Sequence, residues 1–157
     1  MRIGHGYDSH RVSNDSSRQL WLGLVLIPGA VGLDGHSDAD VATHALCDAL
    51  LGAANLGDLG RHFSDQDPAT AGVASRRLLE ATITLVHDAG YRVASADLTI
   101  VAEQPKLAPF MDAMSTELSA VVGTHVSVKA TTAEGMGALG RGEGVSATAV
   151  ALLEGRS

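Results

Sequence analysis

The sequence has 157 residues and a mass of 16.1 kDa, and we expect residues 1–157 to form one domain. Its 45% hydrophobic content with only 3% aromatic residues excludes a disordered chain and predicts a core of small aliphatic side chains. A net charge of −7 excludes a diffuse basic surface, so we expect neither nucleic acid nor an anionic membrane as a partner.

The cellular compartment is predicted from three features. The only cysteine, Cys47, cannot form an intramolecular disulfide, and the first residues show no signal-peptide pattern. The longest uncharged stretch, residues 20–33, is too short to span a bilayer. We therefore expect a cytoplasmic protein in which Cys47 is a buried, inert thiol.

Two strands are expected before the first helix. Residues 3–10 and 20–27 have the apolar patterns of strands, and Pro28 is expected to end the second. From Ser37, a natural N-cap, apolar residues recur at helical spacing. The expected buried face of this helix consists of Val41, Ala45, Leu46, Ala49, Leu50 and Ala53.

The rest of the chain alternates helices with strands. The patterns predict a loop at 57–74, a helix at 75–88, a strand at 94–102, a helix at 110–121, and strands at 126–130 and 145–153. This order predicts an α/β sandwich with helices on one face of a sheet. The other face then needs a partner, and the strand positions that we expect there are Val145, Ala147, Ala149 and Ala151.

A group of polar residues has the spacing of metal ligands. Asp8 and His10 lie two residues apart, so a strand would direct both side chains to one side. Asp40, His44 and Asp48 recur every four residues and form a polar stripe on the first helix. Two imidazoles and one carboxylate leave one position open on tetrahedral zinc. The alternative is that these histidines simply lie on solvated surfaces.

Other segments offer groups for phosphates and hydroxyls. His36 and Ser37 lie at the expected helix start, where free N–H groups favour a phosphate, although Ser37 can equally be a plain cap. Residues 129–134 combine hydroxyls, amides and a carboxylate, which suit a phosphate with a divalent cation or form an exposed turn. Carboxylates at 57–60 and 63–68 can hold hydroxyls or a metal, or they can make Asx turns.

Five segments in this order closely resemble the 2-C-methyl-D-erythritol 2,4-cyclodiphosphate synthase family: residues 6–10, 36–46, 57–60, 63–68 and 140–144. The resemblance covers nearly the whole chain. It implies an α+β fold with a β-α-β-α-β-β core and a mixed sheet, assembled as a homotrimer with active sites between subunits. It also implies a phosphorus–oxygen lyase of the non-mevalonate isoprenoid pathway, which cyclises 4-diphosphocytidyl-2-C-methyl-D-erythritol 2-phosphate and releases CMP.

The resemblance also implies roles for individual residues. Zinc is expected on Asp8, His10 and His44, and Mg²⁺ or Mn²⁺ on Glu134. His36 and Thr132 match positions that stabilise the transition state in the family. The positions that match its substrate pocket are Asp8, Ser9, His10, His36, Ser37, Asp58, Leu59, Gly60, Phe63, Ser64, Asp65, Gln66, Asp67, Ala102, Glu103, Gln104, Pro105, Lys106, Leu107, Ala108, Thr131, Thr132, Ala133, Glu134, Ala138 and Arg141.

Some positions depart from the family pattern. Ala39, Ala133 and Gly135 replace a usual glycine, a common threonine and a frequent lysine, and the pair at 138–139 is smaller than usual. None of these is an expected metal ligand. The turn with Arg141 and Glu143 matches the one that lines the trimer axis in this family, so the resemblance implies an isoprenoid diphosphate as a further ligand there. Two rival classes stay open: a zinc-dependent phosphohydrolase, in which water attacks, and a non-catalytic anion-binding trimer.

Overall fold

The computed structural model describes residues 1–35, 37–63 and 74–156. Its strands are β1 (Arg2–Arg11), β2 (Gln19–Leu22), β3 (Val25–Val31), β4 (Tyr91–Val101), β5 (Val126–Thr131) and β6 (Gly144–Gly155). Its helices are α1 (Val41–Ala54), α2 (Leu59–His62), α3 (Ser75–Asp88), α4 (Met111–Val122) and α5 (Gly137–Gly140), with a 3₁₀ turn at Ala108–Phe110.

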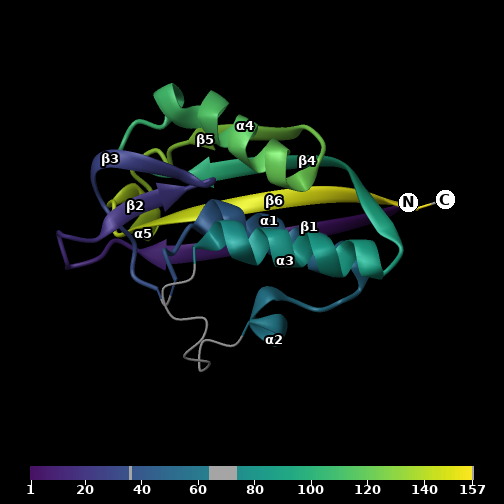
Figure 1. The fold of residues 1–157 in the computed structure, drawn as a ribbon. Coiled ribbons are helices and arrows are strands. Elements are labelled where there is room, and N and C mark those ends of the chain that lie inside the picture. The colour runs from purple at the N-terminus through teal and green to yellow at the C-terminus, as the bar shows by residue number, and fades with distance from the viewer. Residues whose placement is uncertain (36, 64–73, 157) are drawn as a thin grey trace.

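A four-stranded sheet organises these elements, in the order β1-β6-β4-β5. β4 and β5 are parallel, whereas β6 runs antiparallel to both β1 and β4, so the expected mixed sheet is confirmed. Helices α1, α3 and α4 lie on one face of this sheet (Figure 1). The chain ends lie side by side because Arg2 of β1 pairs with Leu153 of β6. The expected α+β architecture is therefore confirmed.

The strand expected at 20–27 is in fact a hairpin of β2 and β3. Gly23 and Leu24 between them have φ values of 56° and 66°. Two consecutive left-handed residues form the kind of turn that suits the twist of a hairpin. Pro28 does not end β3, because it lies at the register shift between the two strands, where the ladder is interrupted and a proline is tolerated.

Helix α1 begins later than expected, because Asp40 caps it in place of Ser37. The fully buried Asp40 carboxylate accepts hydrogen bonds from the Thr43 N–H at 3.0 Å and the Thr43 hydroxyl at 2.6 Å. It also accepts the N–H groups of Gly23 and Leu24, each at 2.8 Å. One carboxylate thus joins the helix start to the β2–β3 turn. The expected apolar face of the helix is buried.

Replacing Asp40 should destabilise the fold more than any exposed substitution. In Asp40→Ala, four donors lose their acceptor inside the protein, and we expect the free energy of unfolding to fall by about 3 kcal/mol. Urea unfolding followed by circular dichroism measures this change. Asp15→Ala is the matched control, because that carboxylate is exposed. A urea midpoint for Asp40→Ala equal to that of Asp15→Ala would contradict this stabilising role of Asp40.

Two glycines on β1 allow α1 to lie directly on the strand. A Cβ atom on Gly4 would lie 1.9 Å from the Ala49 carbonyl oxygen, and one on Gly6 would lie 2.0 Å from the Ala45 carbonyl oxygen. No side chain larger than hydrogen fits between the two elements at these positions. The close contact brings His44 of α1 over the end of β1 that carries Asp8 and His10.

The face of the sheet opposite the helices differs from the expectation. Val145, Ala147, Ala149 and Ala151 are buried beneath the helices and do not lie on the open face. The alternate positions of β6 carry Ser146, Thr148 and Glu154 beside Val150 and Leu152, so the more apolar residue set is the one that packs against the helices. The large apolar side chains that are exposed on β1 and β6 are Ile3 (73%), Tyr7 (56%) and Val150 (42%). This face still offers an apolar surface for a partner.

Candidate metal centre and substrate site

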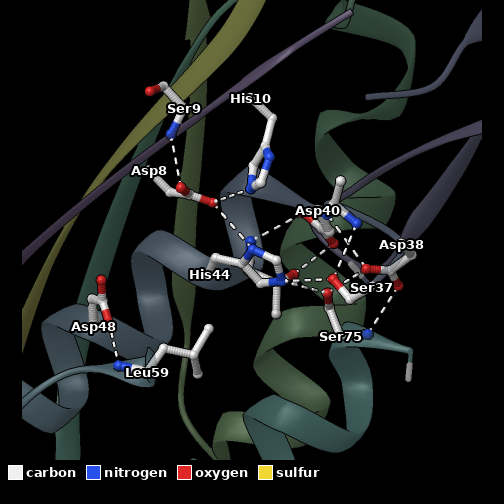
Figure 2. Close-up of polar contacts among 12 residues, drawn as sticks. Asp8, Ser9, His10, Ser37, Asp38, Asp40, His44, Asp48, Leu59 and Ser75 are labelled. Carbon is white, nitrogen blue, oxygen red and sulfur yellow. Dashed lines mark hydrogen bonds and ion pairs between the residues drawn. The ribbon is translucent and has the colours of Figure 1, made fainter. Parts of the chain in front are cut away.

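The three side chains expected to bind a metal converge (Figure 2). Asp8 and His10 come from β1, and His44 comes from α1. Asp8 Oδ2 lies 3.2 Å from His10 Nε2 and 3.1 Å from His44 Nδ1. One potential ligand atom from each residue lies within 4.8 Å of the others. The predicted convergence is confirmed, and we refer to these three residues as the triad.

The triad has the dimensions of a metal site. Tetrahedral zinc with ligand bonds of about 2.0–2.1 Å separates neighbouring donor atoms by about 3.3 Å, close to the two distances found here. The side chains are only partly exposed, at 24% for Asp8, 26% for His10 and 12% for His44. Two nitrogens and one oxygen form a donor set that suits zinc and leaves a position for another ligand. The residues therefore fit this ion.

The charges of Asp8 and His10 are strongly coupled. Burial by itself would raise the pKa of Asp8, but hydrogen bonds and charge interactions with His10 and His44 together hold it well below its usual range. The hydrogen bond to Asp8 raises the pKa of His10, although burial opposes this effect. Below this raised pKa, a proton on His10 compensates the carboxylate in the metal-free protein, and a metal ion must displace that proton.

This coupling predicts that zinc affinity increases with pH. Because the pKa of His10 is raised above 6.5, its stabilising effect on the metal-free fold is complete below pH 6.5 and is lost as pH rises through the folded value. Stabilisation by Asp8 is present above pH 3.8 and is lost only as pH falls through its lowered value. We expect the Zn²⁺ Kd, measured by chelator competition, to weaken by up to about tenfold per pH unit below the folded pKa of His10. A Kd that does not change between about pH 6 and pH 8 would contradict proton displacement.

The triad opens into a cavity of about 280 Å³. The described residues that line it are Asp8, His10, Gly35, Ser37, His44, Asp48, Leu59, Gly60, Phe63 and Leu78. Ser37, Leu59, Gly60 and Phe63 were expected in the substrate pocket, and the structure places them beside the triad. His36 and residues 64–67 lie outside the described residues, so the structure does not place them.

Two expected substrate residues have other local contacts. Asp58 is the N-cap of α2, where its Oδ1 accepts the Arg61 N–H at 2.9 Å, and its side chain does not line this cavity. The Ser9 N–H donates to Asp8 Oδ1 at 2.8 Å, which helps to orient the carboxylate. The contact of Ser9 with the site thus comes from its backbone.

Asp48 was not expected among the site residues, although it lines the cavity. Its Oδ1 accepts the Leu59 N–H at 2.7 Å, so it fastens the start of α2 to α1 (Figure 2). Burial raises the pKa of its carboxyl. The polar stripe formed with Asp40 and His44 was the available signal, because it placed Asp48 one helical turn beyond His44.

The remaining expected residues form a second group around the ends of β4 and β5. Glu103 Oε1 accepts the N–H groups of Ala133 at 2.8 Å and Gly135 at 3.5 Å, which joins residues 102–108 to the turn after β5. Within that turn, Thr132 Oγ1 donates to Glu134 Oε1 at 3.0 Å.

Next to this group, Gln104 and Pro105 line another cavity, of about 370 Å³. In the described part of the chain, no residue of 102–108 or 131–141 lines the triad cavity. One chain therefore holds two separate clusters of expected substrate residues.

Two further sequence expectations concern Cys47 and membranes. Cys47 is buried as expected, and burial raises the pKa of its thiol to about 12, which disfavours the reactive thiolate. Among the described residues, no helix combines the length and the apolar character needed to cross a membrane.

Comparisons with known proteins identify the family of this chain. The model of the YgbB family matches residues 1–154. The 2-C-methyl-D-erythritol 2,4-cyclodiphosphate synthase of Desulfatibacillum aliphaticivorans is 52% identical over 157 residues, which span 98% of this chain and all of that protein.

Two solved structures have the same fold. A 2C-methyl-D-erythritol-2,4-cyclodiphosphate synthase in a CDP-bound form has a TM-score of 0.88 and 39% identity, covering 98% of this chain and all of that one. The bifunctional IspDF of Campylobacter jejuni has a TM-score of 0.93 and 35% identity, covering 98% of this chain but only 42% of that longer protein. The match along nearly the entire sequence shows that this chain belongs to the YgbB family.

Proposed function

We propose that residues 1–157 form one cyclodiphosphate synthase domain, which converts 4-diphosphocytidyl-2-C-methyl-D-erythritol 2-phosphate into 2-C-methyl-D-erythritol 2,4-cyclodiphosphate and CMP. The observation that carries this proposal is the triad, in a chain 52% identical to a synthase of that name over its whole length. The reaction is that of a phosphorus–oxygen lyase in the non-mevalonate isoprenoid pathway, and we expect it in the cytoplasm.

The reaction depends on the positioning of the reacting phosphates more than on proton transfer. The 2-phosphate oxygen attacks the β-phosphorus of the diphosphate while CMP leaves, and a phosphate monoester near neutral pH is nucleophilic without a general base. Zinc on Asp8, His10 and His44 would supply positive charge to the β-phosphate oxygens. We infer that donors at His36 and Thr132 stabilise the charge that develops there during transfer.

The two residue clusters suggest which part of the substrate each of them binds. We infer that residues 58–60 and 63–67, part of which line the triad cavity, hold the hydroxyls of the erythritol moiety. Residues 102–108 would hold the cytidine and its phosphate, a role consistent with the CDP-bound form of a relative. Glu134 would hold Mg²⁺ or Mn²⁺, which would offset the negative charge of the diphosphate.

We infer that the working unit is a homotrimer with shared sites. A separation of the two clusters within one chain is expected if the triad of one subunit faces residues 102–108 and 131–134 of the next. The apolar open face of the sheet, with Ile3, Tyr7 and Val150, would pack around the axis. Arg141, paired with Glu143 at 2.6 Å, would offer a site for an isoprenoid diphosphate near that axis.

Glu134→Gln tests the second metal site. The change keeps the size of the side chain and its contact with Thr132 but removes the charge. We expect CMP release at limiting Mg²⁺ to fall by at least about tenfold, because the cation loses its carboxylate ligand, while the zinc content stays at the wild-type level. A loss that is identical at all Mg²⁺ concentrations would indicate a hydrogen-bonding role instead.

The metal dependence of the reaction tests the proposal as a whole. Purified protein is stripped with a chelator, dialysed, and assayed for CMP release in a single turnover with no metal, with Mg²⁺ alone, and with Mg²⁺ plus Zn²⁺. We expect full activity only with both ions. Equal CMP release in the stripped protein would overturn the metal-dependent mechanism.

A further inference from the structure

The ring of His44 is held on the side away from Asp8. His44 Nε2 lies 3.0 Å from Ser75 Oγ, whereas Nδ1 lies 3.1 Å from Asp8 Oδ2 (Figure 2). Ser75 is fully buried at the first position of α3. Its hydroxyl also contacts Asp38 Oδ1, and its N–H donates to Asp38 Oδ2 at 2.9 Å. A chain of hydrogen bonds thus runs from Asp38 through Ser75 to His44.

The direction of this chain follows from the hydrogens that are available. An ionised Asp38 carboxylate can only accept, so the single hydroxyl hydrogen of Ser75 is used for Asp38. The Ser75 oxygen can then only accept from the imidazole, which places the ring hydrogen of His44 on Nε2. Nδ1 then faces Asp8 Oδ2 at 3.1 Å. Because Asp8 can also only accept, this contact needs a second ring hydrogen in the metal-free protein, and a metal ion held by Asp8 would take the place of that hydrogen.

A second hydroxyl near the ring would favour the opposite tautomer. Ser37 Oγ lies 3.3 Å from His44 Nε2 and accepts the Ala39 N–H at 3.1 Å, so its hydrogen is free to point at the ring. If Ser37 donated to Nε2, the ring hydrogen would move to Nδ1 and occupy the metal position. The shorter contact to Ser75 and the anchored Asp38 carboxylate oppose this arrangement.

The ring of His10 is oriented by a backbone group. Its Nδ1 lies 2.5 Å from the Asp34 carbonyl oxygen, which can only accept a hydrogen bond. One ring hydrogen is therefore on Nδ1, and Nε2 is the atom that faces Asp8 at 3.2 Å, where a metal ion would replace the hydrogen of the protonated ring. Both rings of the triad are thus orientated by an acceptor on their far side, but only His44 depends on other side chains.

We propose that Asp38 and Ser75 are positioning residues that fix the Nε2–H tautomer of His44 and so present its Nδ1 lone pair to a metal ion. This proposal rests on the metal site of the proposed function. Ser75, the first residue of α3, would thus affect metal affinity without contacting the metal itself. Partners of this kind typically change metal affinity by about 10–100-fold.

The first test is the Zn²⁺ affinity of Ser75→Ala, measured by chelator competition. We expect a Kd about 10–100-fold higher than that of the wild type, because Ser37 is then the only hydroxyl beside Nε2 among the residues that the structure describes. Ser115→Ala is the matched control, since it removes a helical serine hydroxyl that donates to the Val126 carbonyl, and its Kd should be unchanged. A wild-type Kd for Ser75→Ala would overturn the proposal.

The second test reads the tautomer directly in metal-free Asp8→Ala, because in the wild type the Asp8 carboxylate, 3.1 Å from Nδ1, would itself draw a hydrogen to that atom. Two-bond ¹H–¹⁵N correlations of the His44 ring, assigned by comparison with the double variant Asp8→Ala/His44→Ala and recorded where the ring is neutral, should show the hydrogen on Nε2. A hydrogen on Nδ1 would overturn the proposal. Failure of the proposed function is distinguishable, because this ring hydrogen is read in a protein without metal.

Discussion

His44→Ala should reduce the zinc content of the purified protein from about one ion per chain to nearly none. The substitution removes one of three metal ligands. Removing a residue that only hydrogen-bonds to a ligand lowers metal affinity by about 10–100-fold, and we expect the loss here to be larger. The fold should persist, because the apolar face of α1 packs through other residues and the His44 ring lies beside the cavity. Elemental analysis and circular dichroism of the same samples measure both effects.

His87→Ala provides the matched control for this loss. His87 lies in the last turn of α3, outside the triad, so its removal deletes an imidazole from a helix without touching the cavity. We expect the control to keep its zinc and its activity. Equal zinc in His44→Ala and His87→Ala, in folded samples, would mean that the triad does not hold the metal.

Mixing two inactive variants should restore activity if the sites are shared. His44→Ala chains keep Glu134, and Glu134→Gln chains keep the triad. In randomly mixed trimers, about a quarter of the interfaces would pair an intact triad with an intact Glu134. We therefore expect co-refolded equimolar chains to recover about a quarter of the wild-type rate of CMP release.

The control for mixing is a pair of variants in the same half of the site. His44→Ala and His10→Ala chains should not complement each other, because every interface then lacks an intact triad. Mass spectrometry of differently tagged chains establishes that subunits have exchanged. Absence of recovery in trimers that are demonstrably mixed, or a monomeric mass by light scattering, would rule out shared sites.

The metal cluster was predictable because local geometry determines most of it. The two-residue period of a strand places Asp8 and His10 on one side, and this holds for any strand containing them. That His44 joins them depends on α1 lying on β1, for which the sequence offers only the small residues Gly4 and Gly6 as a hint. The resemblance to a family supplied this third member with more certainty than spacing alone.

Features that depend on tertiary contacts were not predictable in the same way. The cap at Asp40 exists because the β2–β3 turn comes within reach of its carboxylate, which local propensity does not reveal. The covered face of β6 was assigned wrongly, although its alternation directs the more apolar residue set toward the helices. The contact of Ser75 with His44 joins residues 31 positions apart, so no local pattern contains it.

The identity of the product tests the central claim most directly. Zinc- and magnesium-loaded protein is incubated with the diphosphocytidyl substrate in ¹⁸O-labelled water, and the products are analysed by mass spectrometry and ³¹P NMR. The proposed function predicts CMP and a cyclic diphosphate, both without ¹⁸O, because the 2-phosphate oxygen is the nucleophile. Linear phosphates that carry ¹⁸O would contradict it, since water would then be the nucleophile, as in a zinc-dependent phosphohydrolase.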